Sequence, residues 1–140
     1  DLVKPGGHAF IGLYHRDGRR AFIGHFEELR RAGASEDKMF ARYCMLHSQI
    51  NDEDHARSWF RDQVMHPHET HHTLAEMMPI MEETGARLVS TSINRFSRIA
   101  SLEALLEEEK TLLDVGRQRI AEGRYYPGYF TFLCRKEKLG

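Results

Sequence analysis

The chain has 140 residues, which is long enough for one domain with a hydrophobic core. Its formal net charge is -1 and no apolar run approaches the roughly 20 residues of a membrane span, so neither a nucleic-acid nor a membrane partner is expected. The two cysteines lie far apart in sequence, which argues against a disulfide framework and predicts a reducing, cytoplasmic location.

The N-terminal segment predicts a turn followed by a buried strand. Pro5-Gly6-Gly7 is a strong turn signal. The nearly continuous apolar run over residues 9–14 is typical of a strand that is buried on both faces of an α/β sheet. The sequence begins directly before this turn, so we expect it to be part of a longer protein.

Residues 19–63 predict three short helices. Apolar residues recur at helical spacing from Phe22 and Phe26 onward. Ser35 and Asp52 stand where N-caps of the second and third helices would be needed.

A capped helix and a strand are predicted over residues 73–93. Thr73 and Glu76 match a capping box, and Gly85 is placed to end the helix. Pro79 lies inside it and predicts a kink. Residues 87–93 then have the pattern of a strand, so the segment indicates an α/β unit.

The last third of the chain predicts one long helix and a final strand. Residues 99–122 carry an apolar stripe, and we interpret Glu107-Glu108-Glu109 as its solvated face. Residues 129–134 are rich in aromatic side chains and predict the strand.

Residues 66–72 read HPHETHH and contain H-E-x-x-H, the zinc-protease pattern, from His68 to His72. In zinc proteases both histidines lie on one face of a single helix. Here Pro67 precedes the pattern and Thr73 caps a helix that begins after it, so we expect no such helix and assign no metal ligand. Zinc binding through His68 and His72 is kept as an alternative.

Three blocks of the sequence resemble the C-terminal half of a class I S-adenosylmethionine-dependent methyltransferase. LVKPGGHAFIGLYHRDGR resembles the family's fifth strand, HPHETHHTLAEMMPIMEETGARLVSTSI its last helix and sixth strand, and YYPGYFTFLCRK its seventh strand. The resemblance implies an α/β fold with a partial Rossmann-like sheet of three strands. The last strand would lie between the other two and antiparallel to both.

The resemblance also implies a domain organisation and a missing part. Residues 1–140 would form a single domain, the C-terminal part of a larger methyltransferase domain, with helical lid insertions at 19–63 and 97–124. The family's glycine-rich strand–turn–helix, which binds S-adenosyl-L-methionine, is absent from the sequence. The main cofactor-binding residues are therefore expected outside this chain, and the chain alone is expected to be inactive.

Ligands of open α/β sheets bind beyond the carboxyl ends of the parallel strands, so several polar stretches are expected at one edge. The resemblance then implies that the following residues line the site of the methyl acceptor: Tyr14, Arg16, His66, Glu69, Asn94, Arg95, Tyr125 and Tyr126. His15, His68 and His72 are candidates for a general base. In the alternative, these side chains hold the insertions in place by hydrogen bonds, and the tyrosines pack beneath them.

Two hypotheses of function follow. In the first, the chain is the substrate-side portion of a methyltransferase, whose partners are a methyl acceptor and the missing N-terminal half. In the second, it is a non-catalytic α/β module that binds a partner. Both predict that the edge strand Phe10–Tyr14 pairs with the missing half or with a second chain, because an exposed apolar edge must be covered.

Overall fold

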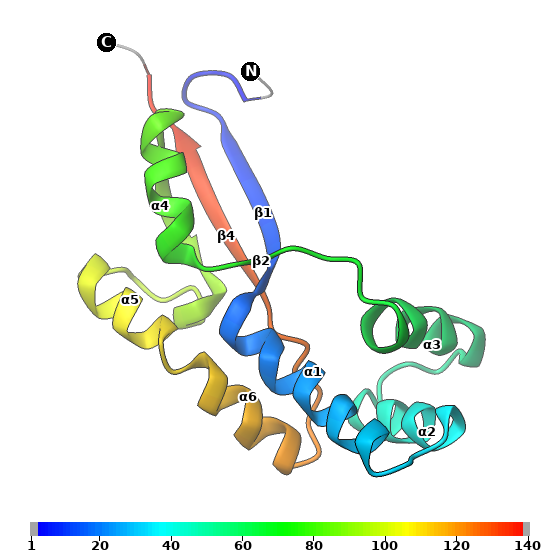
Figure 1. The fold of residues 1–140 in the computed structure, drawn as a ribbon. Helices are drawn as coiled ribbons and strands as arrows, with labels where there is room; N and C mark the ends of the chain where they lie inside the picture. Colours follow the sequence, from blue (N-terminus) through cyan, green and yellow to red (C-terminus); the bar gives the residue numbers. More distant parts are fainter. Residues whose placement is uncertain (1–2, 139–140) are drawn as a thin grey trace.

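The computed structural model describes residues 3–138 and has an α/β fold with a mixed four-stranded sheet (Figure 1). The strands are β1 (His8–His15), β2 (His71–His72), β3 (Ala86–Thr91) and β4 (Tyr129–Lys136). Their order is β2-β1-β4-β3, and β4 runs antiparallel to both β1 and β3, as predicted for the last strand. There are four strands rather than three, because β2 pairs in parallel with the end of β1. Leu2, with which the first block of the resemblance begins, lies outside the described residues.

Helices fill the intervals between these strands. They are α1 (Arg16–Arg31), α2 (Glu36–Leu46), α3 (Glu53–Phe60) with a π-helical turn η1 (Arg61–Met65), α4 (Leu74–Glu83), a 3-10 turn η2 (Ser92–Asn94), α5 (Leu102–Glu109) and α6 (Leu112–Ala121).

The predicted helix caps are confirmed. Ser35 and Asp52 accept hydrogen bonds from backbone N–H groups in the first turns of α2 and α3. Thr73 and Glu76 form the reciprocal capping box of α4. Side chains that satisfy otherwise unpaired N–H groups therefore fix where three of the helices begin.

The single long helix predicted over residues 99–122 is wrong, because the chain forms α5 and α6 with a break at Lys110 and Thr111. There the two N–H groups bond to carbonyls only three residues back, at 3.2 and 3.0 Å, and the Thr111 hydroxyl donates to the Glu108 carbonyl. Such local bonds tighten the turn and compete with the regular helical ladder.

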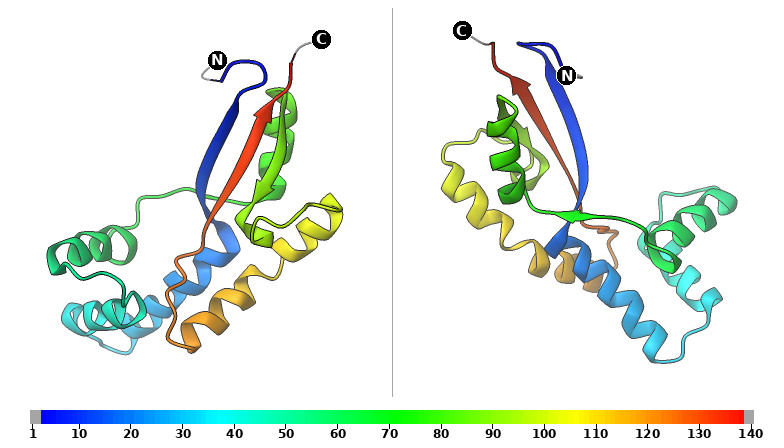
Figure 2. Two further views of the ribbon diagram at one scale, coloured as in Figure 1. Left: turned by 180° about the vertical axis from the view of Figure 1, so that it is seen from behind. Right: turned by 45° about the horizontal axis from the view of Figure 1, so that its top comes forward.

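Among residues 3–138, buried apolar side chains form two hydrophobic cores. They belong to two regions of the fold (Figures 1 and 2). In the sheet region, α4 and α5 pack on one face of β1, β4 and β3 around Leu74, Phe130 and Phe132. In the helical region, α1, α2, α3 and the C-terminal part of α6 surround a core that contains Phe22 and Tyr43. The helical region lies beyond the end of the sheet where β1 passes into α1.

One face and one edge of the sheet are left open. In β1, Ile11 packs against the sheet core, whereas Phe10 points to the opposite face and is 65% exposed. The view from behind in Figure 2 shows no helix over that face. β2 pairs only with Tyr14 and His15, so within residues 3–138 the edge from His8 to Leu13 has no neighbouring strand.

Candidate functional site

The carboxyl ends of β1 and β3 lie at the same end of the sheet, next to the helical region (Figure 1). β1 ends at His15 and β3 ends at Thr91, while β4 begins beside them at Tyr129. Two clefts open here, and both are lined by Tyr129. This is the end of the sheet at which the acceptor site was predicted.

The first cleft, which we call the arginine cleft, has a volume of about 480 Å³ and lies between η2, the break between α5 and α6, and the start of β4. Its lining includes His15, Arg95 and Tyr126 from the predicted set, together with Arg119 of α6. The guanidinium of Arg119 lies 5.6 Å from the ring centre of Tyr126. Burial raises the pKa of the Tyr126 hydroxyl, although the charge of Arg119 opposes this shift.

The second cleft, which we call the β1 cleft, lies on the open side of β1 and has a volume of about 690 Å³. It brings together Tyr14, His68 and Glu69 of the predicted set. The ring centres of Tyr14 and Tyr129 are 5.5 Å apart. A Cβ atom at Gly12 would lie 1.7 Å from the Tyr129 hydroxyl oxygen, so the glycine leaves the space that this ring occupies.

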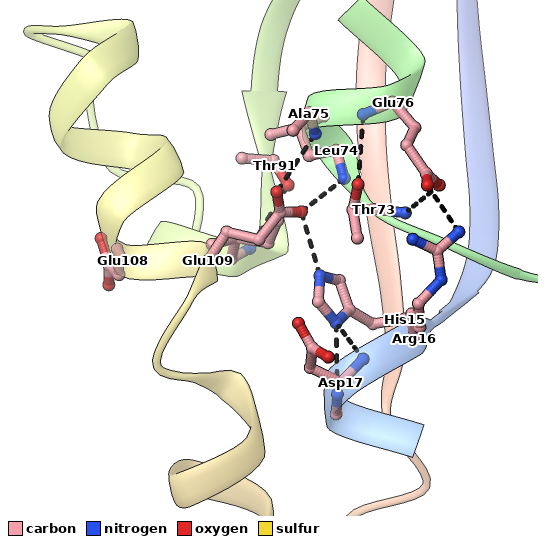
Figure 3. Close-up of polar contacts among 12 residues, drawn as sticks. His15, Arg16, Asp17, Thr73, Leu74, Ala75, Glu76, Thr91, Glu108 and Glu109 are labelled. Atoms are coloured by element: carbon pink, nitrogen blue, oxygen red, sulfur yellow. Dashed lines mark hydrogen bonds and ion pairs between the residues drawn. The ribbon is translucent and has the colours of Figure 1, made fainter. Parts of the chain in front are cut away.

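A buried hydrogen-bond network surrounds His15, which is 1% exposed (Figure 3). Its Nδ1 accepts from the N–H groups of Asp17 and Gly18, both at 3.2 Å, and so caps α1. Nδ1 therefore carries no proton, and the proton on Nε2 is donated to Glu109 Oε2 at 3.0 Å.

Glu109 joins this network to the start of α4. Its carboxylate accepts from the N–H of Leu74 and, at 3.1 Å, from the N–H of Ala75 (Figure 3). Burial raises the pKa of this carboxyl, but the hydrogen bonds from His15 and these two N–H groups outweigh burial, so the pKa lies below its usual value. The interpretation of residues 107–109 as a solvated face is wrong for Glu109, which is 4% exposed.

A second buried network joins α1 to the segment before β2. Arg19 is fully buried, and its guanidinium forms a bidentate pair with the Glu69 carboxylate. Nε donates to Oε1 at 2.5 Å and Nη2 donates to Oε2 at 3.1 Å. It also donates to the carbonyl oxygens of Gln63 and Pro127 and lies 4.4 Å from the ring centre of Tyr14. Such fork-to-carboxylate pairs are strong and fix orientation, so Glu69 is held in place rather than free to meet a ligand.

The predicted histidines occupy different positions. His66 is exposed and lines neither cleft. His68 is exposed in the β1 cleft, and Nε2 of His72 lies 3.0 Å from the Thr70 hydroxyl. The role of His15 as a base stays a prediction, although both of its ring nitrogens are engaged as the structural alternative expects.

The other predicted residues are held by local contacts. Arg16 forms an ion pair with Glu76 at 2.5 Å (Figure 3). The amide of Asn94 donates to the Ser97 carbonyl at 3.1 Å, while its buried Oδ1 has no partner within residues 3–138. Tyr125 belongs to the helical region, where its hydroxyl donates to Gln63 at 2.6 Å.

The helix that the H-E-x-x-H pattern requires is not formed. His68 lies in a coil and His72 in β2, and α4 starts only at Leu74. The prediction that Thr73 caps a helix beginning after the pattern is therefore confirmed. No group of three or more potential metal ligands occurs among residues 3–138.

Three functional candidates were not predicted from the sequence, namely Arg19, Glu109 and Arg119. For two of them a signal existed. Arg19 stands three residues before Phe22 on the apolar stripe of α1, and Glu109 stands between Leu105 and Leu112 on the stripe of the next helices. A charged residue on an apolar stripe needs a buried partner. Arg119 offered no signal of this kind.

Comparison with known proteins adds no relative: no family model matches the chain, and no curated protein or solved structure matches it. Within the described part of the chain, no helix is long and apolar enough to cross a bilayer.

Proposed function

We propose that the chain is the substrate-side portion of an S-adenosylmethionine-dependent methyltransferase, with a Rossmann-like sheet completed by residues outside it. The observation that carries the proposal is the order β1-β4-β3, with β4 antiparallel to its two neighbours. It is the arrangement of the fifth, seventh and sixth strands that the sequence resemblance implies. The open edge from His8 to Leu13 is where the next strand of such a sheet would pair.

The described residues do not themselves fit the cofactor. The turn from β1 into α1 has no intervening loop, and the His15 side chain already occupies N–H groups at the start of α1. In nucleotide-binding turns those N–H groups face the ligand. S-adenosyl-L-methionine would therefore be held mainly by the missing N-terminal half, and this chain would supply the acceptor side.

The two clefts support an acceptor site at this end of the sheet. Both lie at the carboxyl ends of the parallel strands β1 and β3, where ligands of open α/β sheets bind. Because Tyr129 lines both, an acceptor seated in the arginine cleft would lie next to the β1 cleft, on the side where the missing strand would be added. Most of the catalytic effect would then come from positioning the acceptor.

The test compares this chain with the protein made from its full natural reading frame. Calorimetry with S-adenosyl-L-methionine should show binding by the longer protein and none by the 140-residue chain. The longer protein should also transfer a tritiated methyl group into a small-molecule extract, and a glycine-rich strand–helix motif should lie roughly 80–120 residues upstream. Tight binding by the chain alone would contradict the missing half. A longer protein without cofactor binding would contradict the methyltransferase.

The open sheet face favours one alternative, a non-catalytic module that binds a partner. Phe10 and Tyr129 are 65% and 53% exposed there, which is high for large apolar side chains. This alternative predicts that the longer protein binds no cofactor and that the edge at Phe10 pairs with a second chain instead. Calorimetry on the longer protein therefore separates the two functions.

A further inference from the structure

The arginine cleft contains two guanidinium groups that the fold does not neutralise. Within residues 3–138, the guanidinium of Arg95 has no hydrogen bond or ion pair, and that of Arg119 contacts the ring of Tyr126 but no carboxylate or carbonyl. Several other arginines are paired, as Arg16 is with Glu76 and Arg124 with Glu122. Arg61, Arg98 and Arg135 also lack a side-chain ion pair within the described residues, but none of them lines this cleft. Two unpaired cations that line one cleft attract an anionic ligand.

The one acidic side chain in the lining does not cancel this charge. Glu108 is exposed in the lining, and its single negative charge offsets only one of the two guanidinium charges. The other carboxylate nearby, Glu109, is committed to His15 and the N–H groups of α4. The cleft therefore keeps an excess of positive charge.

The backbone that presents Arg95 is unusual. Arg95 and Phe96 both have left-handed conformations, with φ values of 57° and 59°. Large side chains rarely adopt this conformation, and such strain concentrates at ligand sites. The turn is held by bonds from the N–H groups of Arg95 and Phe96 to the carbonyls of Ser92, at 3.0 Å, and Thr91, at 2.8 Å.

Aromatic residues line much of the remaining wall. Phe96, Tyr126, Tyr129 and Phe130 all line the cleft. Phe96 is 52% exposed, so its ring is open to contact with a ligand. Rings of this kind favour a planar, apolar ligand body, while a planar guanidinium fork matches a carboxylate or phosphate.

We infer that the arginine cleft binds a small aromatic acid, with its carboxylate or phosphate on Arg95 and Arg119 and its ring against Phe96 and Tyr126. This inference rests on the proposed function, for which it names the class of methyl acceptor. A volume of about 480 Å³ is sufficient for a ligand of this size.

The test titrates the 140-residue chain with benzoate, phenyl phosphate and the uncharged benzyl alcohol, followed by NMR chemical shifts. We expect at least one anion to bind about tenfold more tightly than the alcohol, with shifts at Tyr126 and around Arg95. The tighter of the two anions identifies the acidic group. Equal binding of all three probes, or anion shifts that miss this cleft, would overturn the inference.

Three variants complete the test. Arg119→Met and Arg95→Asn should each weaken anion binding about tenfold and leave binding of the alcohol unchanged. Asparagine tolerates the left-handed backbone, so Arg95→Asn should preserve the turn. It therefore still tests the inference if Arg119→Met does not fold. Arg117→Met is the matched control, because Arg117 lies on the exposed side of α6, where it is 67% exposed and near Asp114. Unchanged anion affinity in both test variants would refute the assignment.

The titration needs no cofactor, so the two proposals fail separately. Anion preference in the chain, together with a longer protein that binds no S-adenosyl-L-methionine, would contradict the methyltransferase and not the cleft. Methyl transfer by the longer protein that prefers uncharged acceptors would overturn the cleft and not the methyltransferase.

Discussion

The helical region and the sheet region bury their apolar side chains in different ways. In the helical region aromatic rings pack on all sides: Tyr43 lies between 5.7 and 6.4 Å from the rings of Phe22, Phe26, Phe60 and Tyr125. The sheet region covers one face only, and Phe10 on the other face is left 65% exposed. The helical region therefore closes around its core, although Met45 and Trp59 are exposed on its surface, whereas the sheet presents an uncovered face on which more protein can pack.

The strongest test of this comparison targets the Arg19–Glu69 pair, which lies where the two regions meet. Arg19→Ala should lower the free energy of unfolding by about 3–5 kcal/mol, because it removes the guanidinium from the Glu69 carboxylate, which is only 11% exposed and keeps only His71 as a partner. Arg20→Ala is the matched control, since Arg20 is 63% exposed and should contribute less than about 1 kcal/mol. Urea unfolding followed by circular dichroism measures both. Equal losses of unfolding free energy in the two variants would show that the Arg19–Glu69 pair does not hold the regions together.

The second test uses two glycines. Gly128 has a φ of 75°, and a Cβ there would lie 2.2 Å from the Arg19 nitrogen, so Gly128→Ala should cost about 2–3 kcal/mol. Gly24 lies within α1 with nothing within 4 Å of the added Cβ, so Gly24→Ala should stabilise by about 0.5–1 kcal/mol. The midpoints of urea unfolding should move in opposite directions. A stable Gly128→Ala variant would mean that the two regions pack less closely than described.

The third test compares neighbouring residues on the two faces of β1. Ile11→Asn should cost about 2 kcal/mol, because Ile11 packs against the sheet core. Phe10→Asn should change the free energy of unfolding by no more than about 0.5 kcal/mol in the isolated chain. Phe10→Asn should instead weaken any self-association seen by sedimentation. A large loss of stability at Phe10 would show that the open face is covered.

The smallest expected effect concerns pH and separates the regions by their titrating groups. Burial lowers the pKa of His25 and His47 in the helical region, and the charge of Arg42 lowers that of His25 further. A group whose pKa is lower in the folded state contributes stability that is lost as pH falls below its unfolded-state pKa, here 6.5. The helical region should therefore weaken first on acidification.

The His15–Glu109 network in the sheet region should respond only at lower pH. The pKa of Glu109 lies below 4.5, so its contribution is present above that pH and is lost as pH falls further. Trp59, whose ring centre lies 5.7 Å from that of His47, reports on the helical region by fluorescence. His47→Gln should flatten the change between pH 6.5 and 5, while Glu109→Gln should not. The reverse result would show that the acid-sensitive groups are not the histidines of the helical region.

Local patterns in the sequence were sufficient for much of the fold. Caps such as Ser35 and the Thr73–Glu76 box act through neighbours in sequence, so the starts of α2 and α4 were predictable. The placement of β4 between β1 and β3 came from the resemblance alone, since period-two patterns do not say which strands pair.

The site was harder to predict, because its contacts join residues far apart in sequence. Glu109 meets Leu74, and Arg19 meets Glu69, and no local pattern encodes either pair. The break at Lys110 depends on hydrogen bonds that outweigh good helical propensity on both sides. The common end of the sheet was predictable, but the division of its residues between two clefts was not.

The passage from β1 into α1 also limits how the protein can move. His15 is both the last residue of the strand and the N-cap of the helix, and both of its ring nitrogens are hydrogen-bonded. A hinge needs a few residues whose dihedral angles are free to change, and this connection has none. The helical region therefore does not swing about β1. Movement beside the clefts is therefore expected in short segments that lack regular structure, such as residues 66–70 and 95–100.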